Sequence, residues 1–448
     1  MTKITFMGAG STIFAKNIIG DAMLTDCLRD SNIALYDIDA ERLHESKLML
    51  ENLNKNINDE RAVITTHLGI KQRKAALKDA DFVINAIQVG GYEPSTVADF
   101  EIPKKYGLRQ TIGDTIGIGG IFRALRTIPV LEGFANDMKA VCPRAWFLNY
   151  TNPMSILTGF LIRKCGIKTV GLCHSVQACV GSLLKTLGIE KDYDMTKFKT
   201  RIAGINHQAW LLELIYDGKD IYPEIKKLAF EKLDAWRKAP KAEKSANMVR
   251  LEVMRKFGYY VTESSEHSAE YMPYWIKRNY PELIDEYNIP LDASPDRCRA
   301  IVANWNKQYK DICENPVLTH KKSNEFGCGI MEAIVTDKPY TIAGNVLNHG
   351  FIENLPAEAV VEVPCLVNRN GVQGTYFGRL PTQCAAINQT NINTQLLTIE
   401  AIVTRSKEKI YQAALLDPHT SAELSPDDII RLVDEMIAAH GDRLPHYV

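Results

Sequence analysis

A cysteine and a histidine each stand at the polar end of a short apolar run. Cys173 closes TVGLC (residues 169–173), and His207 closes RIAGINH (residues 201–207). If both runs are strands of one sheet, the two side chains converge at the edge where the strands end. A thiolate and an imidazole supply half of a site for Mn²⁺, Zn²⁺ or Fe²⁺, with positions left open for substrate oxygens.

Two other interpretations of these residues stay open. Cys173 and His174 could be a nucleophile and its base. Neighbours on an extended strand point to opposite faces, which disfavours that pair. Cys173 and His207 could also be buried packing residues without a ligand, as isolated cysteines and histidines commonly are.

The stretch GAGST (residues 8–12) lies between an apolar run and a helix-like segment, as a phosphate-binding turn does. One glycine permits the tight turn, and the second lets the backbone approach a pyrophosphate at the helix N-terminus. Ile13 replaces the third glycine of the usual pattern, but Asp37 ends the second strand, where a carboxylate binds an adenosine ribose. An acid there favours NAD over NADP. The predicted cofactor-binding residues are Gly8, Gly10, Ser11, Thr12 and Asp37.

Two asparagines follow the fifth strand in NYTNP (residues 149–153), and they should rim the same crevice. Asn149 is predicted to contact the nicotinamide, and Asn152 offers its amide to substrate hydroxyls. The alternative is that an Asn-rich turn before proline serves turn geometry only.

A polar segment, TESSEHSAEY (residues 262–271), is predicted to face the crevice with an acid–base cluster. It contains Glu263, Glu266, His267, Glu270 and Tyr271. The alternative is a solvated helix start, with a serine as the cap and glutamates favoured by the helix dipole.

The elements that position these residues are those of an α/β protein. Strands and helices alternate over the first 90 residues, which indicates a parallel sheet covered on both faces. Helices are predicted over residues 40–57, 117–143 and 425–441, and strands over 339–348 and 359–368. We therefore expect an NAD-binding, Rossmann-like domain over residues 1–200. An α/β (α+β) domain over residues 201–448 would complete the active site and form the oligomer.

Composition excludes several classes of protein. The net charge of −1, from 53 basic and 54 acidic residues, offers no electrostatic basis for binding nucleic acid or an anionic membrane. The N-terminus has no long apolar segment, and no apolar run is long enough to span a bilayer. The ten cysteines form no CxxC pair and are expected to be reduced thiols. A cytoplasmic location is predicted.

These pieces together resemble glycoside hydrolase family four, the NAD- and metal-dependent glycosidases. The resemblance runs nearly from end to end, and its motifs are together highly specific. CHSV (residues 173–176) is similar to the α-galactosidase (melibiase) branch of the family. The other motifs that carry it are KITFMGAGSTIF, ALYDID, QVGGYEPSTVADFEIPKKYGLRQTIGDTIGIGGIFRALRTIP, NYTNPM, AGINH, TESSEHSAEY and QTNIN.

The resemblance implies bound NAD, a divalent metal that is usually Mn²⁺, and a small-molecule α-galactoside such as melibiose as substrate. Cys173 and His207 would ligate the metal, Asn152 would bind the sugar, and His174 would be the acid for the leaving group. It also implies oxidation at C3, elimination between C1 and C2, addition of water and re-reduction, with retention of configuration.

One departure from the family pattern concerns the base at C2. Relatives carry Asp or Tyr where this chain has Ser265, so Glu266 or Tyr271 is predicted to take over that role, with a metal-bound hydroxide as the alternative. The resemblance also implies a homodimer or homotetramer. The alternatives are another family-four glycosidase (α-glucosidase, α-glucuronidase or α-galacturonidase), an NAD-dependent 2-hydroxy acid dehydrogenase, and a non-catalytic NAD sensor.

Overall fold

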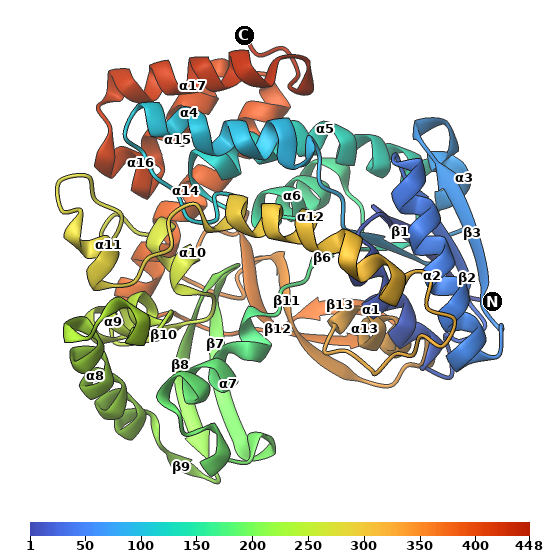
Figure 1. The fold of residues 1–448 in the computed structure, drawn as a ribbon, viewed down its shortest axis with the longest axis horizontal. Coiled ribbons are helices and arrows are strands. Elements are labelled where there is room, and N and C mark those ends of the chain that lie inside the picture. The colour runs from blue at the N-terminus through green and yellow to red at the C-terminus, as the bar shows by residue number, and fades with distance from the viewer.

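The computed structural model describes residues 1–448, apart from the side chain of Asn306. A single 13-stranded sheet runs through the molecule (Figure 1), with a path of β10-β8-β7-β12-β11-β6-β5-β4-β1-β2-β3 and with β13 and β9 added at its side. The strands are β1 (Lys3–Met7), β2 (Asn32–Asp37), β3 (Val63–Leu68), β4 (Phe82–Asn85), β5 (Trp146–Asn149), β6 (Thr169–Gly171), β7 (Phe198–Ile205), β8 (Gln208–Tyr216), β9 (Lys219–Asp220), β10 (Tyr260–Val261), β11 (Tyr340–Leu347), β12 (Val360–Asn368) and β13 (Gly371–Gly374).

The N-terminal strands form the predicted parallel sheet. β1 pairs with β2 and β4, β2 with β3, β4 with β5, and β5 with β6, all in parallel. The resulting order, 3-2-1-4-5-6, is that of dinucleotide-binding folds. The predicted Rossmann-like fold is thereby confirmed.

Both faces of this sheet are buried, because successive side chains of a strand point to opposite sides. On β4, Phe82 and Ile84 join one apolar cluster with Ile18 and Leu50, whereas Val83 joins the other. Helices α1, α2, α7 and α13 contribute side chains to the first cluster, and α3, α5, α6 and α17 contribute side chains to the second. Figure 1 shows α14 to α17, in orange and red, beside α4 and α5.

The helices begin and end close to the predicted positions, with α2, α5 and α17 matching the three expected segments. Their bounds are α1 (Thr12–Met23), α2 (Ala40–Asn58), α3 (Arg73–Leu77), α4 (Val97–Lys105), α5 (Gly117–Val141), α6 (Met154–Phe160), α7 (Ser175–Leu187), α8 (Tyr222–Lys238), α9 (Met248–Phe257), α10 (Ser265–Glu270), α11 (Glu282–Glu286), α12 (Ala293–Ile312), α13 (Phe326–Thr336), α14 (Thr382–Thr404), α15 (Lys407–Leu416), α16 (Pro418–Glu423) and α17 (Pro426–His440). Across the helices that the structure describes, none is long and apolar enough to cross a membrane.

The remaining strands continue the sheet in an antiparallel arrangement. The β11–β12 hairpin lies between β6 and β7, pairing through Asn345 with Gly171 on one side and through Glu362 with Gly204 on the other. β7 and β8 form a second hairpin, and β10 pairs with β8. The N-terminal sheet therefore passes into the second half of the chain through backbone hydrogen bonds. The division into residues 1–200 and 201–448 stays a prediction.

Candidate functional site

The strand ends that carry Cys173 and His207 belong to one sheet, as expected. Cys173 lies two residues beyond β6, just before α7. His207 lies in the two-residue turn between β7 and β8, with φ 62°. Strands β11 and β12 separate β6 from β7. The left-handed backbone at His207 helps to turn the chain tightly enough to keep this imidazole at the site.

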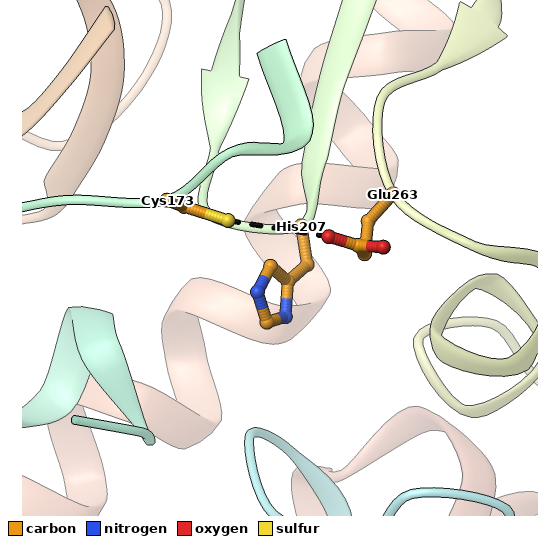
Figure 2. Close-up of side chains that lie close together, drawn as sticks. All are labelled: Cys173, His207 and Glu263. Atoms are coloured by element: carbon orange, nitrogen blue, oxygen red, sulfur yellow. Dashed lines mark hydrogen bonds between the residues drawn. The ribbon is translucent and has the colours of Figure 1, made fainter. Parts of the chain in front are cut away.

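A third donor completes the group. Glu263 follows β10, and its carboxylate, the Cys173 thiol and an imidazole nitrogen of His207 lie within 4.8 Å of one another. Cys173 Sγ donates a long hydrogen bond of 4.0 Å to Glu263 Oε2. Figure 2 shows Cys173 and Glu263 pointing toward each other, with the His207 ring beside them. The sequence placed Glu263 only within a polar cluster, so its pairing with Cys173 was missed.

The electrostatics of this group suit a divalent cation. Burial, and then the neighbouring Glu263, raises the pKa of Cys173 to about 11. Burial would also raise the pKa of Glu263, but His207 and His267 outweigh it, and the net pKa is lowered. Within the described part of the chain, the buried Nδ1 of His207 has no hydrogen-bond partner. The site thus offers a thiol, an ionised carboxylate and an imidazole whose Nδ1 has no hydrogen-bond partner. These donors suit a metal ion, which would deprotonate the thiol when it binds.

Two of the three donors, Cys173 and His207, border a hollow of about 450 Å³, which we call the inner hollow. It extends from the start of α1 to the ends of β4, β5 and β6, where ligands bind in sheets of this type. Its lining includes Ser11, Phe14, Ile87, Gln88, Asp114, Arg123, Tyr150, Asn152, Cys173, His174 and His207.

Asn152 lies in the inner hollow with two residues to which the sequence assigned no role. Its Nδ2 donates to Asp114 Oδ2 at 3.3 Å, and Arg123 Nε donates to its carbonyl at 3.2 Å. Burial alone would raise the pKa of Asp114, but Arg123 and His267 hold the net pKa below its usual value. Among the described side chains, the buried Oδ1 of Asn152 lacks a partner. The signal for Asp114 and Arg123 was their position in the glycine-rich stretch before and within α5.

The glycine turn has the shape that a dinucleotide requires. Gly8 has φ 87°, and a Cβ there would lie 2.8 Å from the carbonyl of Ala86. Gly10 N donates to Asp37 Oδ2 at 2.6 Å, which places the predicted ribose-binding carboxylate against the turn. A Cβ on Gly10 would meet that oxygen at 2.9 Å. The close approach of backbone and carboxylate fits the predicted NAD site.

The other two predicted residues of this turn differ in environment. Ser11 is exposed and lines the inner hollow. Thr12 is buried, and its hydroxyl shares a 3.0 Å hydrogen bond with Ser46 of α2. In this arrangement Thr12 holds two helices together, and Ser11 faces the ligand space.

Asn149 is buried, and its amide is used by the protein itself. Its Oδ1 accepts from Asn85 Nδ2 at 2.9 Å and from Thr151 N at 3.1 Å. Its Nδ2 donates to the carbonyl of Thr151 at 3.2 Å and to Thr158 Oγ1 at 3.3 Å. Asn149 therefore orders the turn that carries Asn152. Its predicted contact with the nicotinamide stays a prediction.

The two residues predicted as bases have other partners. Both carboxylate oxygens of Glu266 accept from Arg297 Nη2, at 2.5 and 2.6 Å. Tyr271 is buried and donates its hydroxyl to the carbonyl of Asn206 at 3.1 Å. Ser265 Oγ accepts from Arg250 N. Ser265, Glu266 and Tyr271 are not among the residues that line the inner hollow. The catalytic roles of Glu266 and Tyr271 stay predictions.

His174 immediately precedes α7 and borders the inner hollow. Its Nε2 donates to Glu325 Oε2 at 2.6 Å, and this hydrogen bond raises the pKa of the imidazole. A histidine held in this way keeps a proton to higher pH, as an acid should. Glu325 is the residue of this pair that the sequence did not reveal.

Comparisons with known proteins agree with this arrangement. Residues 3–189 match the profile of the Family 4 glycosyl hydrolase, and residues 202–420 match that of its C-terminal domain. The chain is 60% identical over 447 residues to an alpha-galactosidase of Bacillus subtilis, covering 100% of both chains.

Two solved structures share the fold. LplD from Bacillus subtilis superimposes with a TM-score of 0.83 at 26% identity, covering 97% of this chain and 99% of that one. A 6-phospho-alpha-glucosidase from gut microorganisms, solved with NAD and Mn²⁺, superimposes with a TM-score of 0.77 at 20% identity and covers 100% of both chains.

Proposed function

Because the chain belongs to the family 4 glycosyl hydrolases, we propose that it hydrolyses terminal α-galactosides such as melibiose. The activity named for the relative that is 60% identical supports this substrate. NAD and a divalent metal, Mn²⁺, are its cofactors. The structural neighbour solved with both supports that pair.

One observation carries the proposal. Cys173 and His207 of the metal group and Ser11 of the glycine turn border a single hollow, so a metal and a nicotinamide would meet the same substrate. A 2-hydroxy acid dehydrogenase transfers its hydride without a thiolate ligand. A non-catalytic NAD sensor has no use for the metal group.

Different residues would bind the metal, the dinucleotide and the sugar. Cys173 and His207, with Glu263, would hold the metal, and Gly8, Gly10 and Asp37 would hold the dinucleotide. When bound, NAD would supply the acceptor and donor for a hydride of the sugar, and the metal would supply a Lewis acid. Asn152 orients the sugar through its amide.

Two proton transfers belong to residues of this chain. His174, whose Nε2–H is held by Glu325, supplies the proton of its other ring nitrogen, Nδ1, to the leaving oxygen. For removal of the proton at C2, Glu266 and Tyr271 remain the proposed residues. Asp114 is a further ionised carboxylate in the inner hollow and is proposed as the third candidate.

The proposal also includes the cellular location, the oligomeric state and the domain division of the protein. All ten cysteines are free, which suits the reducing cytoplasm. We also propose that the protein forms a homodimer or homotetramer and that its two domains meet near residue 200.

The deciding experiment measures galactose released from p-nitrophenyl α-galactoside and melibiose, with and without NAD⁺, Mn²⁺ and a thiol reductant. We expect turnover to require all three. The corresponding α-glucoside and α-galacturonide test the other family-four activities. Turnover that persists after removal of both NAD⁺ and metal would contradict the proposed chemistry.

A further inference from the structure

A second hollow adjoins the site, and its lining residues other than His174 and Glu325 have no role in the proposal above. It has a volume of about 680 Å³ and lies between α7, α13 and the segment 322–325, and we call it the outer hollow. Its size falls in the range of small-molecule binding sites. His174 lines both the inner and the outer hollow, so its imidazole stands where the two meet.

The position of His174 indicates which part of the substrate would lie in the outer hollow. When the bond between C1 and the glycosidic oxygen breaks, its electron pair stays on that oxygen, which takes a proton from His174. The leaving group must therefore lie on the His174 side of the galactose. We propose that the outer hollow is the binding site for the leaving group, and that it selects a hydroxyl-rich one, a saccharide. This inference rests on the proposed function.

The lining chemistry indicates the saccharide. Gln177, Lys322, Lys338 and Glu332 offer donors and acceptors of both charge signs, which suits hydroxyl groups that donate and accept at once. The ring of Tyr340 supplies an apolar surface for the C–H face of a sugar. The positive charges of the two lysines are balanced by the negative charges of Glu325 and Glu332, so the outer hollow has no excess positive charge that would favour a phosphorylated leaving group.

One edge of the outer hollow is held firmly to the body of the protein. Asp21, buried in α1, accepts from His320 Nε2 at 2.7 Å, from Ser323 N at 2.8 Å and from Ser323 Oγ at 2.5 Å. These bonds anchor the segment that carries Lys322 and Glu325. A fixed edge spares a ligand the entropy of ordering a loop, so the outer hollow has the preorganisation expected of a binding site.

Glu325 connects this edge to the chemistry. Its side chain is only 8% exposed, and its carboxylate accepts a hydrogen bond from His174 Nε2. Asp21 thus positions Ser323, the same segment positions Glu325, and Glu325 positions His174. The acid and the leaving-group site are parts of one anchored unit.

The test compares two substrates that share galactose and differ in the leaving group. Methyl α-galactoside releases methanol, which is too small to fill the outer hollow, and melibiose releases glucose. Variants Lys338→Ala and Gln177→Ala remove exposed side chains of the lining. Lys321→Ala is the matched control, because Lys321 is equally exposed and adjoins Lys322 outside the lining. Galactose is quantified by anion-exchange chromatography with the NAD⁺- and Mn²⁺-loaded enzyme.

We expect the ratio of kcat/KM for melibiose to that for methyl α-galactoside to fall roughly three- to tenfold in each lining variant, the loss of one hydrogen bond. The control should keep the wild-type ratio. An unchanged ratio in both lining variants, or an equal change in the control, overturns the inference and leaves the proposed function intact. A wild-type enzyme that hydrolyses neither galactoside overturns the proposed function instead.

Discussion

Binding of the metal should release one proton from Cys173. The pKa of this thiol is about 11 in the metal-free protein, because the side chain is buried and faces Glu263. A solution at pH 8 is about three pH units below the pKa of this thiol. Ionising the thiol there costs about 4 kcal/mol, at ~1.36 kcal/mol per unit. A cation that binds the thiolate must supply this free energy.

The sign of the pH dependence follows from this proton. The free protein holds the proton and the metal complex does not, so a rise in pH favours the complex. The apparent affinity for Mn²⁺ should therefore increase about tenfold per pH unit above the ordinary histidine range. Glu263 is ionised throughout, since its pKa is lowered, and it contributes no proton.

Isothermal titration calorimetry measures this proton directly. Mn²⁺ is titrated anaerobically near pH 8 in two buffers of different ionisation enthalpy, and the difference in heat gives the number of protons released. We expect about one. Cys173→Ser should abolish the release and most of the affinity. Cys179→Ser, which removes another buried thiol with a pKa of about 11, is the control. Release of no proton by the wild-type protein would refute the assignment of Cys173 as a ligand.

Three further predictions follow from the structure. Glu263→Gln should weaken Mn²⁺ binding about 10- to 100-fold by calorimetry, whereas Glu266→Gln should leave it within twofold; equal effects would contradict the role of Glu263. Asp99→Asn should lower the free energy of unfolding by about 3–5 kcal/mol in urea, because Arg126 pairs with Asp99 at 2.6 Å with both side chains buried; a change below 1 kcal/mol would refute this. Galactose produced in D₂O should carry deuterium at C2 by NMR, and its absence would exclude the elimination step.

Local features of the chain predicted the nucleotide half of the site. The glycine turn and Asp37 come together through β1 and β2, which are neighbouring parallel strands. Strand alternation, the turn glycines and the acid at the strand end are all short-range signals, and they agree. The helix over residues 426–440 was similarly predictable, because Ser425 caps it through the N–H of Asp428 and Gly441 follows its end.

Long-range packing decided the partners that the sequence left ambiguous. Glu263 and Glu266 belong to one polar stretch, but only Glu263 meets Cys173, whereas Glu266 pairs with Arg297 from α12. Asn149 and Asn152 are three residues apart, yet one is enclosed by its own turn and the other borders the inner hollow. Residue type alone cannot separate such neighbours, because a shift of one or a few positions turns a side chain to a different surface.

The sequence by itself therefore determined the fold of the N-terminal sheet and the nucleotide turn, since both depend on residues at strand ends that a parallel sheet must bring to one edge. It also predicted that Cys173 and His207 lie close together, although His207 follows β7, which belongs to the antiparallel part of the sheet. Only the tertiary structure decided that Glu263 joins them, that Glu325 holds His174, and that a second hollow opens beside it. These contacts join segments 90 and 151 residues apart. They arise because the antiparallel strands extend the sheet and α13 packs against β11 and β12, which no local pattern encodes.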